Sequence, residues 1–309
     1  MSNSPENPVT IADEVRAALE EGRGVVALET TIVVHGLPAP VNLDVAKECA
    51  DAVREGGAVP ATIGVLDGHA VVGLTLEELE RLADPAREAA KLSGRDLGLA
   101  LALGRDGATT VAGTIALARR VGVDVMATGG LGGVHRDAQR SFDESADLTT
   151  LSRTSVLVVA SGVKSILDIG ATLERLDSLG VPVVGYRTST FPGFYRSDSG
   201  FALDWMVSNA HDAARAFLAH REFASSGFLL AHAVAPESQL DEGLHDGALA
   251  SALELVRSLG VSGKEVTPVL LAQFARFTGG RSVQVNRDLV VANARLAGQV
   301  ATAMSDARR

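Results

Sequence analysis

The chain has 309 residues, of which 46% are hydrophobic and only 4% aromatic, so its core must be built from Ala, Val, Leu and Ile, as is typical of helices stacked on a buried sheet. The formal net charge is −10 and no basic run is present, which argues against a nucleic-acid polymer as partner but does not exclude a small anionic ligand. The single cysteine, Cys49, excludes a disulfide framework and a thiolate metal cluster. Because the N-terminus is polar and acidic and the apolar runs are too short to span a bilayer, we expect a cytoplasmic protein.

The first third of the chain predicts alternating helices and strands. Residues 1–10 are predicted to be a disordered lead, and helical apolar spacing extends over 9–21. The continuous apolar run GVVALETTIVVHG indicates a strand buried on both faces, and residues 42–56 form an amphipathic pattern typical of a helix. ATIGVL and HAVVGL predict a β-hairpin around an Asp-Gly turn, after which Thr75 is expected to cap the helix LEELERLA.

The rest of the chain continues this strand-to-helix rhythm around an irregular insertion, FPGFYRSDSG. The expected elements are a helix over 108–121, a strand over 123–127, a strand over 155–160, a helix over 165–179, a strand over 181–186, a helix over 211–222, a strand over 226–231, and helices near 241–259, 264–277 and 285–304. We therefore predict one α/β/α domain over 11–305, with a small subdomain near 60–100 as the alternative.

Charged or polar residues follow three predicted strands, at the ends where α/β sheets gather their ligands. They are Glu29, the loop 128–136 and Lys164. Lys164 is predicted at the start of a helix, after an apolar strand, where the macrodipole and partial burial would both favour a neutral, nucleophilic amine. The alternative, equally supported by the residues, is an exposed lysine or one paired with Asp168.

The glycine-rich loop TGGLGGVHR has amides that could cradle a phosphate, with His135 or Arg136 adding positive charge. The alternative is an ordinary turn. It matches no Walker A motif, since no GKS or GKT follows, and it does not open a dinucleotide-binding helix. HExxH, GxSxG and CxxC are also absent, which disfavours zinc proteases and serine hydrolases.

The segment FDESADL brings together Asp143, Glu144 and Asp147, whose oxygens suit Mg²⁺ or Mn²⁺ with water completing the shell. The alternative is structural: Ser145 or Asp147 caps the helix that follows.

Ten motifs occur in one order between residues 25 and 293: ALETTIVVHGLP, GAVPATIGVL, KLSGRDL, GATTVAGT, ATGGLGGVHR, FDESADL, SGVKSILDIG, GVPVVGY, GKEVTPVLL and TGGRSVQVN. Together they resemble the pseudouridine-5′-phosphate glycosidase family, also called the indigoidine synthase A-like family. The resemblance implies a mixed-sheet α/β/α fold, a homotrimer, and the reversible cleavage of pseudouridine 5′-phosphate with water to ribose 5-phosphate and uracil. It further implies that the sugar ring opens and that a lysine forms a Schiff base at C1, so that the carbon–carbon bond can break.

The resemblance also assigns roles to particular residues. Lys164 matches the nucleophile, Glu29 the proton donor, and Asp143 the ligand of one Mn²⁺ ion that is otherwise held by water. Asp147 matches a substrate contact and a proton-transfer partner. The further substrate-contacting positions that the resemblance implies are Lys91, Val111, Ser145, Ala146, His135 and Asn286.

The chain departs from the family pattern at Gly94, Ser161, Val163 and His232, which bear on substrate affinity more than on the type of reaction. One alternative keeps the fold and the lysine but acts on a different C-riboside phosphate. Another is a non-enzymatic nucleotide-binding module. A Schiff-base aldolase on a barrel is disfavoured, because eight regular βα units are not visible.

Overall fold

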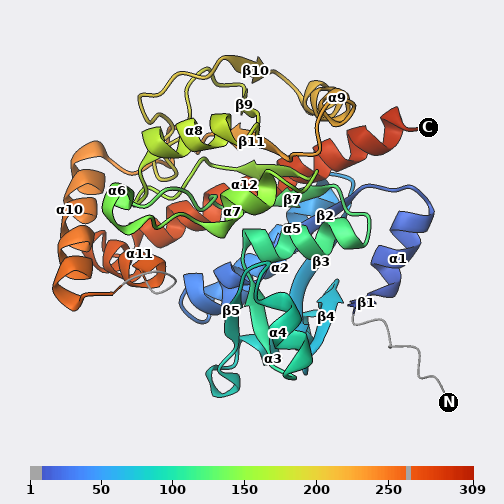
Figure 1. The fold of residues 1–309 in the computed structure, drawn as a ribbon, viewed down its shortest axis with the longest axis horizontal. Coiled ribbons are helices and arrows are strands. Elements are labelled where there is room, and N and C mark those ends of the chain that lie inside the picture. The colour runs from blue at the N-terminus through green and yellow to red at the C-terminus, as the bar shows by residue number, and fades with distance from the viewer. Residues whose placement is uncertain (1–8, 262–265) are drawn as a thin grey trace.

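The computed structural model describes residues 9–261 and 266–309, which form a β-sheet between two layers of helices (Figure 1). The predicted three-layer α/β/α fold with a mixed sheet in a single domain is confirmed. The strands in chain order are β1 (Val9–Ile11), β2 (Val25–Glu29), β3 (Val59–Leu66), β4 (His69–Val72), β5 (Ala90–Leu92), β6 (Gly107–Thr109), β7 (Val125–Ala127), β8 (Leu157–Ala160), β9 (Val183–Tyr186), β10 (Trp205–Val207) and β11 (Phe228–His232).

The eleven strands of the described residues belong to one sheet, in the order β1-β4-β3-β2-β7-β8-β11-β9-β10, with β6 paired to β3 and β5 paired to β6. The middle of the sheet, from β3 through β2, β7, β8 and β11 to β9, is parallel, whereas β4 and β6 run antiparallel to β3. Strands β2, β7 and β8 are buried throughout their length. Their carboxyl ends therefore meet at one edge, where polar side chains can gather.

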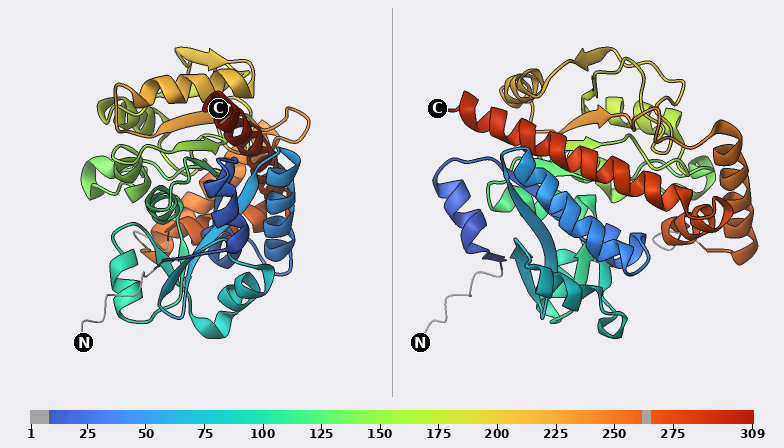
Figure 2. Two further views of the ribbon diagram at one scale, coloured as in Figure 1. Left: turned by 90° about the vertical axis from the view of Figure 1, so that its right-hand side faces the viewer. Right: turned by 180° about the vertical axis from the view of Figure 1, so that it is seen from behind.

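Helices cover both faces of the sheet (Figure 2). On one face, α12 packs against α2 and against β2, β7 and β8, while α5 packs on β2 and α7 from the opposite face. The helices in chain order are α1 (Asp13–Glu20), the π-helix η1 (Ile32–Gly36), α2 (Val41–Glu55), α3 (Leu76–Ala83), the 3-10 turn η2 (Pro85–Arg87), α4 (Leu97–Ala102), α5 (Val111–Arg120), α6 (Ala138–Ser141), α7 (Ala146–Leu151), α8 (Ile169–Ser178), α9 (Ala210–Arg221), α10 (Glu242–Leu259), α11 (Val266–Phe277) and α12 (Arg281–Ala307).

Local sequence signals fix several of these boundaries as expected. The β3–β4 hairpin turns at Asp67 and Gly68, whose φ angles of 49° and 76° are the left-handed values that a two-residue hairpin needs. Thr75 caps α3: its hydroxyl accepts from the Glu78 amide at 3.2 Å, and the Glu78 carboxylate accepts from the Thr75 amide at 2.8 Å.

The N-terminal predictions are partly wrong. Val9 and Thr10, placed by the sequence analysis in a disordered lead, lie in β1, which pairs with β4. The helix predicted from residue 9 begins only at Asp13. The remainder of the predicted lead, residues 1–8, lies outside the described residues.

The long strand predicted over GVVALETTIVVHG is also wrong in its second half, because β2 ends at Glu29 and Ile32 begins a π-helix. The Thr30 hydroxyl donates to the carbonyl of Ile63, and the Thr30 carbonyl accepts from the amides of Val33 and Val34, which turns the chain away from the sheet. The β-branched residues of η1 then pack on a second apolar cluster under α3. Tertiary packing thus overrides their strand propensity.

Two predicted helices start later than expected. The helix predicted from residue 108 starts at Val111, because Gly107–Thr109 pair with β3 and β5 as strand β6. The helix predicted from residue 165 starts at Ile169, because the Asp168 carboxylate caps it by accepting from the Ala171 amide at 2.9 Å.

Candidate active site

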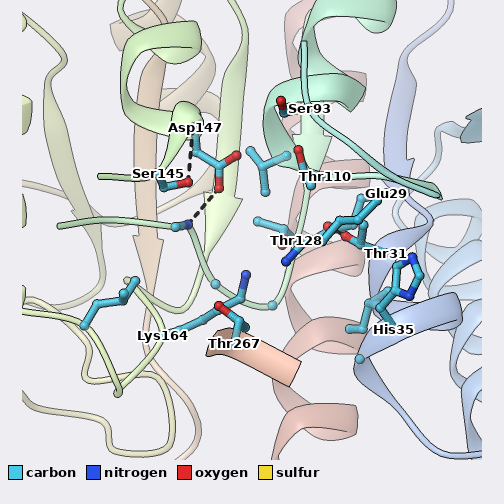
Figure 3. Close-up of a pocket in the computed structure, with 18 of the residues that line it drawn as sticks. Glu29, Thr31, His35, Ser93, Thr110, Thr128, Ser145, Asp147, Lys164 and Thr267 are labelled. Carbon is cyan, nitrogen blue, oxygen red and sulfur yellow. Dashed lines mark hydrogen bonds between the residues drawn. The ribbon is translucent and has the colours of Figure 1, made fainter. Parts of the chain in front are cut away.

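A pocket with a volume of about 300 Å³ opens where β2, β7 and β8 end (Figure 3). It is lined by side chains from the strand ends and from α5, α7, α11 and α12. Each residue to which the family resemblance assigns a role is part of this lining, namely Glu29, Lys91, Val111, His135, Asp143, Ser145, Ala146, Asp147, Lys164 and Asn286. Residues far apart in the sequence are therefore brought to one cavity.

Glu29 is the last residue of β2 and is 9% exposed. Each carboxylate oxygen accepts a hydrogen bond from a threonine hydroxyl: Oε2 from Thr31 and Oε1 from Thr128, which follows β7. The Glu29 carboxylate is thus held at the pocket wall by two side chains that are themselves part of that wall.

Asp147 lies in the first turn of α7 and is 5% exposed. Its Oδ1 accepts from the amide of Ala112 at 2.9 Å, and its Oδ2 accepts from the amide of Gly132 at 2.9 Å. One side chain therefore ties together the start of α5 and the glycine-rich loop. The structural alternative for this segment is confirmed, since the Ser145 hydroxyl caps α7 by accepting from the Asp147 amide at 3.2 Å.

Lys164 is half-buried and lines the pocket, but it does not begin a helix. Its backbone amide donates to Leu131 at 3.2 Å, and its carbonyl accepts from the Leu167 amide at 2.9 Å in a turn that precedes α8. The macrodipole argument for a neutral amine is therefore wrong, because α8 starts at Ile169. The Asp168 partner considered in the sequence analysis instead uses its carboxylate as the cap of α8.

His135 and Asp143 form a second polar pair, with 3.7 Å between His135 Nδ1 and Asp143 Oδ2. Burial lowers the pKa of His135, Asp143 opposes that change, and the positive charges of Lys164 and Lys91 lower it further. The imidazole is thereby biased toward its neutral form.

The three carboxylates of the segment FDESADL differ in the hydrogen bonds that they already accept from the protein, and therefore in whether they could bind a metal ion. Glu144 accepts from Arg175 Nε at 2.9 Å, and both oxygens of Asp147 hold backbone amides. Asp143, with a side chain 32% exposed at the pocket, is the carboxylate that remains available. Within residues 9–261 and 266–309, no group of three or more His, Cys, Asp or Glu side chains is arranged as a metal cluster. The donor set thus fits a hard divalent cation held by one carboxylate and water, not a cation caged by protein ligands.

Only part of the glycine-rich loop has its amides engaged within the protein, so the phosphate cradle suggested by its sequence stays a prediction for Gly129 and Gly130, which line the pocket. Amides along it already donate within the protein, those of Thr128, Leu131, Gly132, Val134 and His135. The absence of a side chain matters most at Gly132, where a Cβ atom would stand 2.2 Å from Ser145 Oγ and 2.6 Å from Asp147 Oδ2. Arg136 donates to the Ile166 carbonyl at 3.3 Å and is not among the residues that line the pocket.

Sequence reasoning missed several polar residues of the lining, namely Thr31, His35, Ser93, Arg95 and Thr267. Most of them lie inside the quoted motifs, within a few residues of a predicted site position, which is the signal that could have found them. Two lining residues also carry a buried polar atom without a hydrogen-bond partner among the described residues, His35 Nε2 and Asn286 Oδ1. Atoms of this kind at a pocket wall are candidates for bonding a ligand.

No helix among the described residues combines the length and the apolar character needed to cross a membrane.

Known proteins resemble this chain along almost its whole length. The pseudouridine-5′-phosphate glycosidase of Salinispora tropica is 57% identical over 292 residues, which cover 94% of this chain and 90% of that protein. The protein of the same name from Streptomyces griseus is 53% identical over 301 residues, covering 96% and 93% of the two chains.

Two solved structures also resemble this fold over nearly the whole chain. A prealnumycin C-glycosynthase, AlnA, crystallised with ribulose 5-phosphate, superposes with a TM-score of 0.90 at 39% identity, over 98% of this chain and 99% of that one. An indigoidine synthase A-like protein from Thermotoga maritima superposes with a TM-score of 0.88 at 35% identity, over 99% and 100% of the two chains. Residues 14–303 match the family described as indigoidine synthase A like protein. With this match and these identities, the chain belongs to the indigoidine synthase A-like family.

Proposed function

We propose that this protein is a pseudouridine-5′-phosphate glycosidase, which converts pseudouridine 5′-phosphate and water into ribose 5-phosphate and uracil. Relatives of that name share about half of its residues or more. The observation that carries the proposal is that half-buried Lys164 shares one pocket with two buried carboxylates, Glu29 and Asp147. A primary amine and positioned carboxyl groups are what covalent cleavage of a carbon–carbon bond requires.

The proposed reaction divides the work among these groups. Glu29 gives a proton to the ring oxygen as the C1–O bond opens, and Lys164 Nζ bonds to C1. When the C–C bond breaks, its electron pair goes to uracil C5, which takes up a proton, while the nitrogen lone pair forms a C=N bond to C1. Water then hydrolyses this imine, which frees ribose 5-phosphate and regenerates the amine. Asp147 is the second proton-transfer partner in this scheme.

We further propose that Asp143 holds one divalent cation, Mn²⁺ in our expectation, with water as its other ligands. Such an ion would supply positive charge that offsets the negative charge of the substrate and of the neighbouring carboxylates. Lys91, Val111, Ser145, Ala146, His135 and Asn286 are proposed substrate contacts, on the strength of their place in the pocket lining.

A cytoplasmic homotrimer is the assembly that we propose. Its support in this chain is limited to large apolar side chains that a monomer would leave in water, such as Trp205 and Met206, which are 71% and 53% exposed on the edge strand β10.

A second candidate keeps the lysine chemistry and changes the leaving group. It is favoured by the similarity to a prealnumycin C-glycosynthase, whose name describes the making of a different C-glycoside. Uracil release from pseudouridine 5′-phosphate separates the two, because only the first candidate predicts turnover of that compound.

The test is a uracil-release assay with Mn²⁺, run on the wild-type protein and on Lys164→Arg. A guanidinium stays protonated near neutral pH and cannot act as the amine nucleophile, so the variant should lose turnover while remaining folded. No uracil from the wild-type protein would contradict the proposal. If ribose 5-phosphate also bound without a reducible adduct, a non-enzymatic nucleotide-binding module would be favoured.

A further inference from the structure

Asn293 sits in the middle of α12, on the side that packs against the sheet, and is 0% exposed. Its Nδ2 donates two hydrogen bonds, one to the carbonyl of Thr128 at 2.9 Å and one to the hydroxyl of Ser161 at 3.0 Å. Thr128 follows β7 and Ser161 follows β8. Asparagine is a poor residue for a helix interior, so its presence at a fully buried position is explained by these bonds between two strand ends.

His232, at the end of β11, completes this arrangement. Its Nδ1 lies 2.9 Å from Asn293 Oδ1, and because an amide oxygen can only accept, Nδ1 must carry the hydrogen. Its ring packs against Tyr186 in a T-shaped arrangement, with ring centroids 5.4 Å apart. His232 thereby fixes which way the Asn293 amide faces, so that both N–H groups point at the β7 and β8 loops. One side chain thus joins the ends of three neighbouring strands.

Of the two loops joined by Asn293, one contacts and the other carries a reacting group of the proposed function. The Thr128 hydroxyl donates to Glu29, the proposed proton donor. The segment that begins at Ser161 leads to Lys164, the proposed nucleophile, whose side chain lines the same pocket. Asn293 and His232 are not among the residues of that lining, so neither is placed to touch the substrate.

We propose that Asn293, oriented by His232, is a positioning residue that sets Glu29 and Lys164 at their working separation. The inference rests on the proposed function for the roles of those two groups. Because a displacement of about 1 Å can cost on the order of a hundredfold in rate, loosening this link should lower kcat. It should leave KM nearly unchanged, because the substrate contacts stay in place.

His232→Leu and His232→Asn form the test pair. Leucine removes the donor to Asn293, whereas asparagine keeps an N–H near the position of Nδ1. We expect His232→Leu to lower kcat about tenfold or more with KM within about twofold, and His232→Asn to restore most of the rate, as misplacement of a catalytic group predicts. Adding Asn293→Ser to His232→Leu should cause little further loss, because the histidine acts through that amide.

His220→Leu is the matched control. The His220 ring bonds the hydroxyl of Ser226 at 3.0 Å and is also half-buried, but neither residue lines the pocket. This variant should lose stability and keep kcat. Equal kcat for His232→Leu and wild type, or equal losses in His232→Leu and His220→Leu, would show a merely structural network and overturn the proposal.

Crystal structures of the wild type and His232→Leu without substrate separate this inference from the proposed function. We expect the variant to lose the contact between the Asn293 amide and the Thr128 carbonyl, and to lose with it the alignment of Thr128 on Glu29. An unchanged contact overturns the inference even if the wild type releases uracil. A lost contact supports the link between the two loops even if another C-riboside phosphate proves to be the substrate.

Discussion

The two buried carboxylates of the pocket are held by different kinds of donor. Glu29, at the end of a strand, is bonded by the hydroxyls of Thr31 and Thr128, whereas Asp147, at the start of a helix, is bonded by the backbone amides of Ala112 and Gly132. A hydroxyl can donate or accept by rotating, but an amide N–H can only donate. The surroundings of Glu29 can therefore follow a change in its protonation, while those of Asp147 fix an acceptor in place.

This difference indicates different roles for the two carboxylates. We call the side of the pocket formed by Glu29, Thr31 and Thr128 the Glu29 wall, and the side formed by Asp147 and Gly132 the Asp147 wall. The Glu29 wall is suited to giving and taking a proton without rearrangement of the backbone. The Asp147 wall joins α5 to the glycine-rich loop, so its carboxylate is part of the local structure as well as of the pocket. Substitutions at the two positions should consequently separate chemistry from stability.

The largest effect is expected at Asp143, a third carboxylate of the pocket. Among the described residues its side chain accepts from neither a hydroxyl nor a backbone amide, and its Oδ2 lies 3.7 Å from His135 Nδ1. With one carboxylate and water as ligands, a divalent cation should bind weakly and exchange readily. Chelation with EDTA should abolish uracil release, and Mn²⁺ should restore it. Full activity after exhaustive chelation would remove the metal from the mechanism.

Glu29→Gln should come next in size. Loss of the proton donor is expected to lower kcat by about 10²- to 10⁴-fold. The free energy of unfolding should change by less than about 1 kcal/mol, because the threonine hydroxyls can rotate to accept from the new amide. A rate close to that of the wild type, measured with saturating substrate, would show that Glu29 does not transfer the proton.

Asp147→Asn should affect stability in a way that Glu29→Gln does not. One oxygen is replaced by an NH₂ group, which must face the amide of Ala112 or that of Gly132, and neither can reverse. We expect the free energy of unfolding to fall by about 1–3 kcal/mol in denaturant titration, the cost of an unsatisfied buried donor. Equal free energies of unfolding for Asp147→Asn and Glu29→Gln would contradict the proposed difference between the donors around the two carboxylates.

The smallest effect concerns pH and two histidines whose pKa values are lowered, His35 and His232. Burial lowers the pKa of His35, with Lys91 lowering it further, and burial also lowers the pKa of His232, assisted by Arg187 and opposed by the bond to Asn293. The unfolded chain therefore binds these protons more readily, and stability should fall as the pH drops below about 6.5. The slope should be at most about 1.4 kcal/mol per pH unit for each histidine.

Denaturant titrations at a series of pH values measure this slope. His232→Asn, which lacks the titrating group, should show a shallower slope than the wild-type protein. Identical slopes for the two proteins would contradict the role assigned to His232 burial.

The location of the site was predictable because parallel strands place their carboxyl ends at one edge. That rule alone singled out Glu29, the loop 128–136 and Lys164, and all three segments contribute to the pocket. The start of α8 was predicted wrongly because the sequence offers two residue types that cap helices, Ser165 and Asp168. In the structure Asp168 is the cap, and Ser165 instead donates to the Gly193 carbonyl at 3.1 Å.

The partners of the carboxylates could not be predicted, because they depend on contacts between distant segments. Thr128 reaches Glu29 across 99 positions of the sequence, and the Asn293 amide reaches Thr128 across 165. Neither the hydrophobic periodicity nor a local motif predicts such pairings. They form only in the folded protein, where β2 lies beside β7 in the sheet and α12 packs against both strands. The sequence therefore indicates the proposed reacting groups, and the fold alone shows which side chains hold them in place.

The central claim, that Lys164 is the covalent nucleophile, is tested most directly by reductive trapping. Borohydride added with ribose 5-phosphate should attach one sugar to the peptide that contains Lys164, detected by mass spectrometry after proteolysis. Lys91→Arg is the control: Lys91 lines the same pocket, and this variant should still be trapped at Lys164. An adduct on Lys91 instead, or substantial uracil release by Lys164→Arg, would contradict the account.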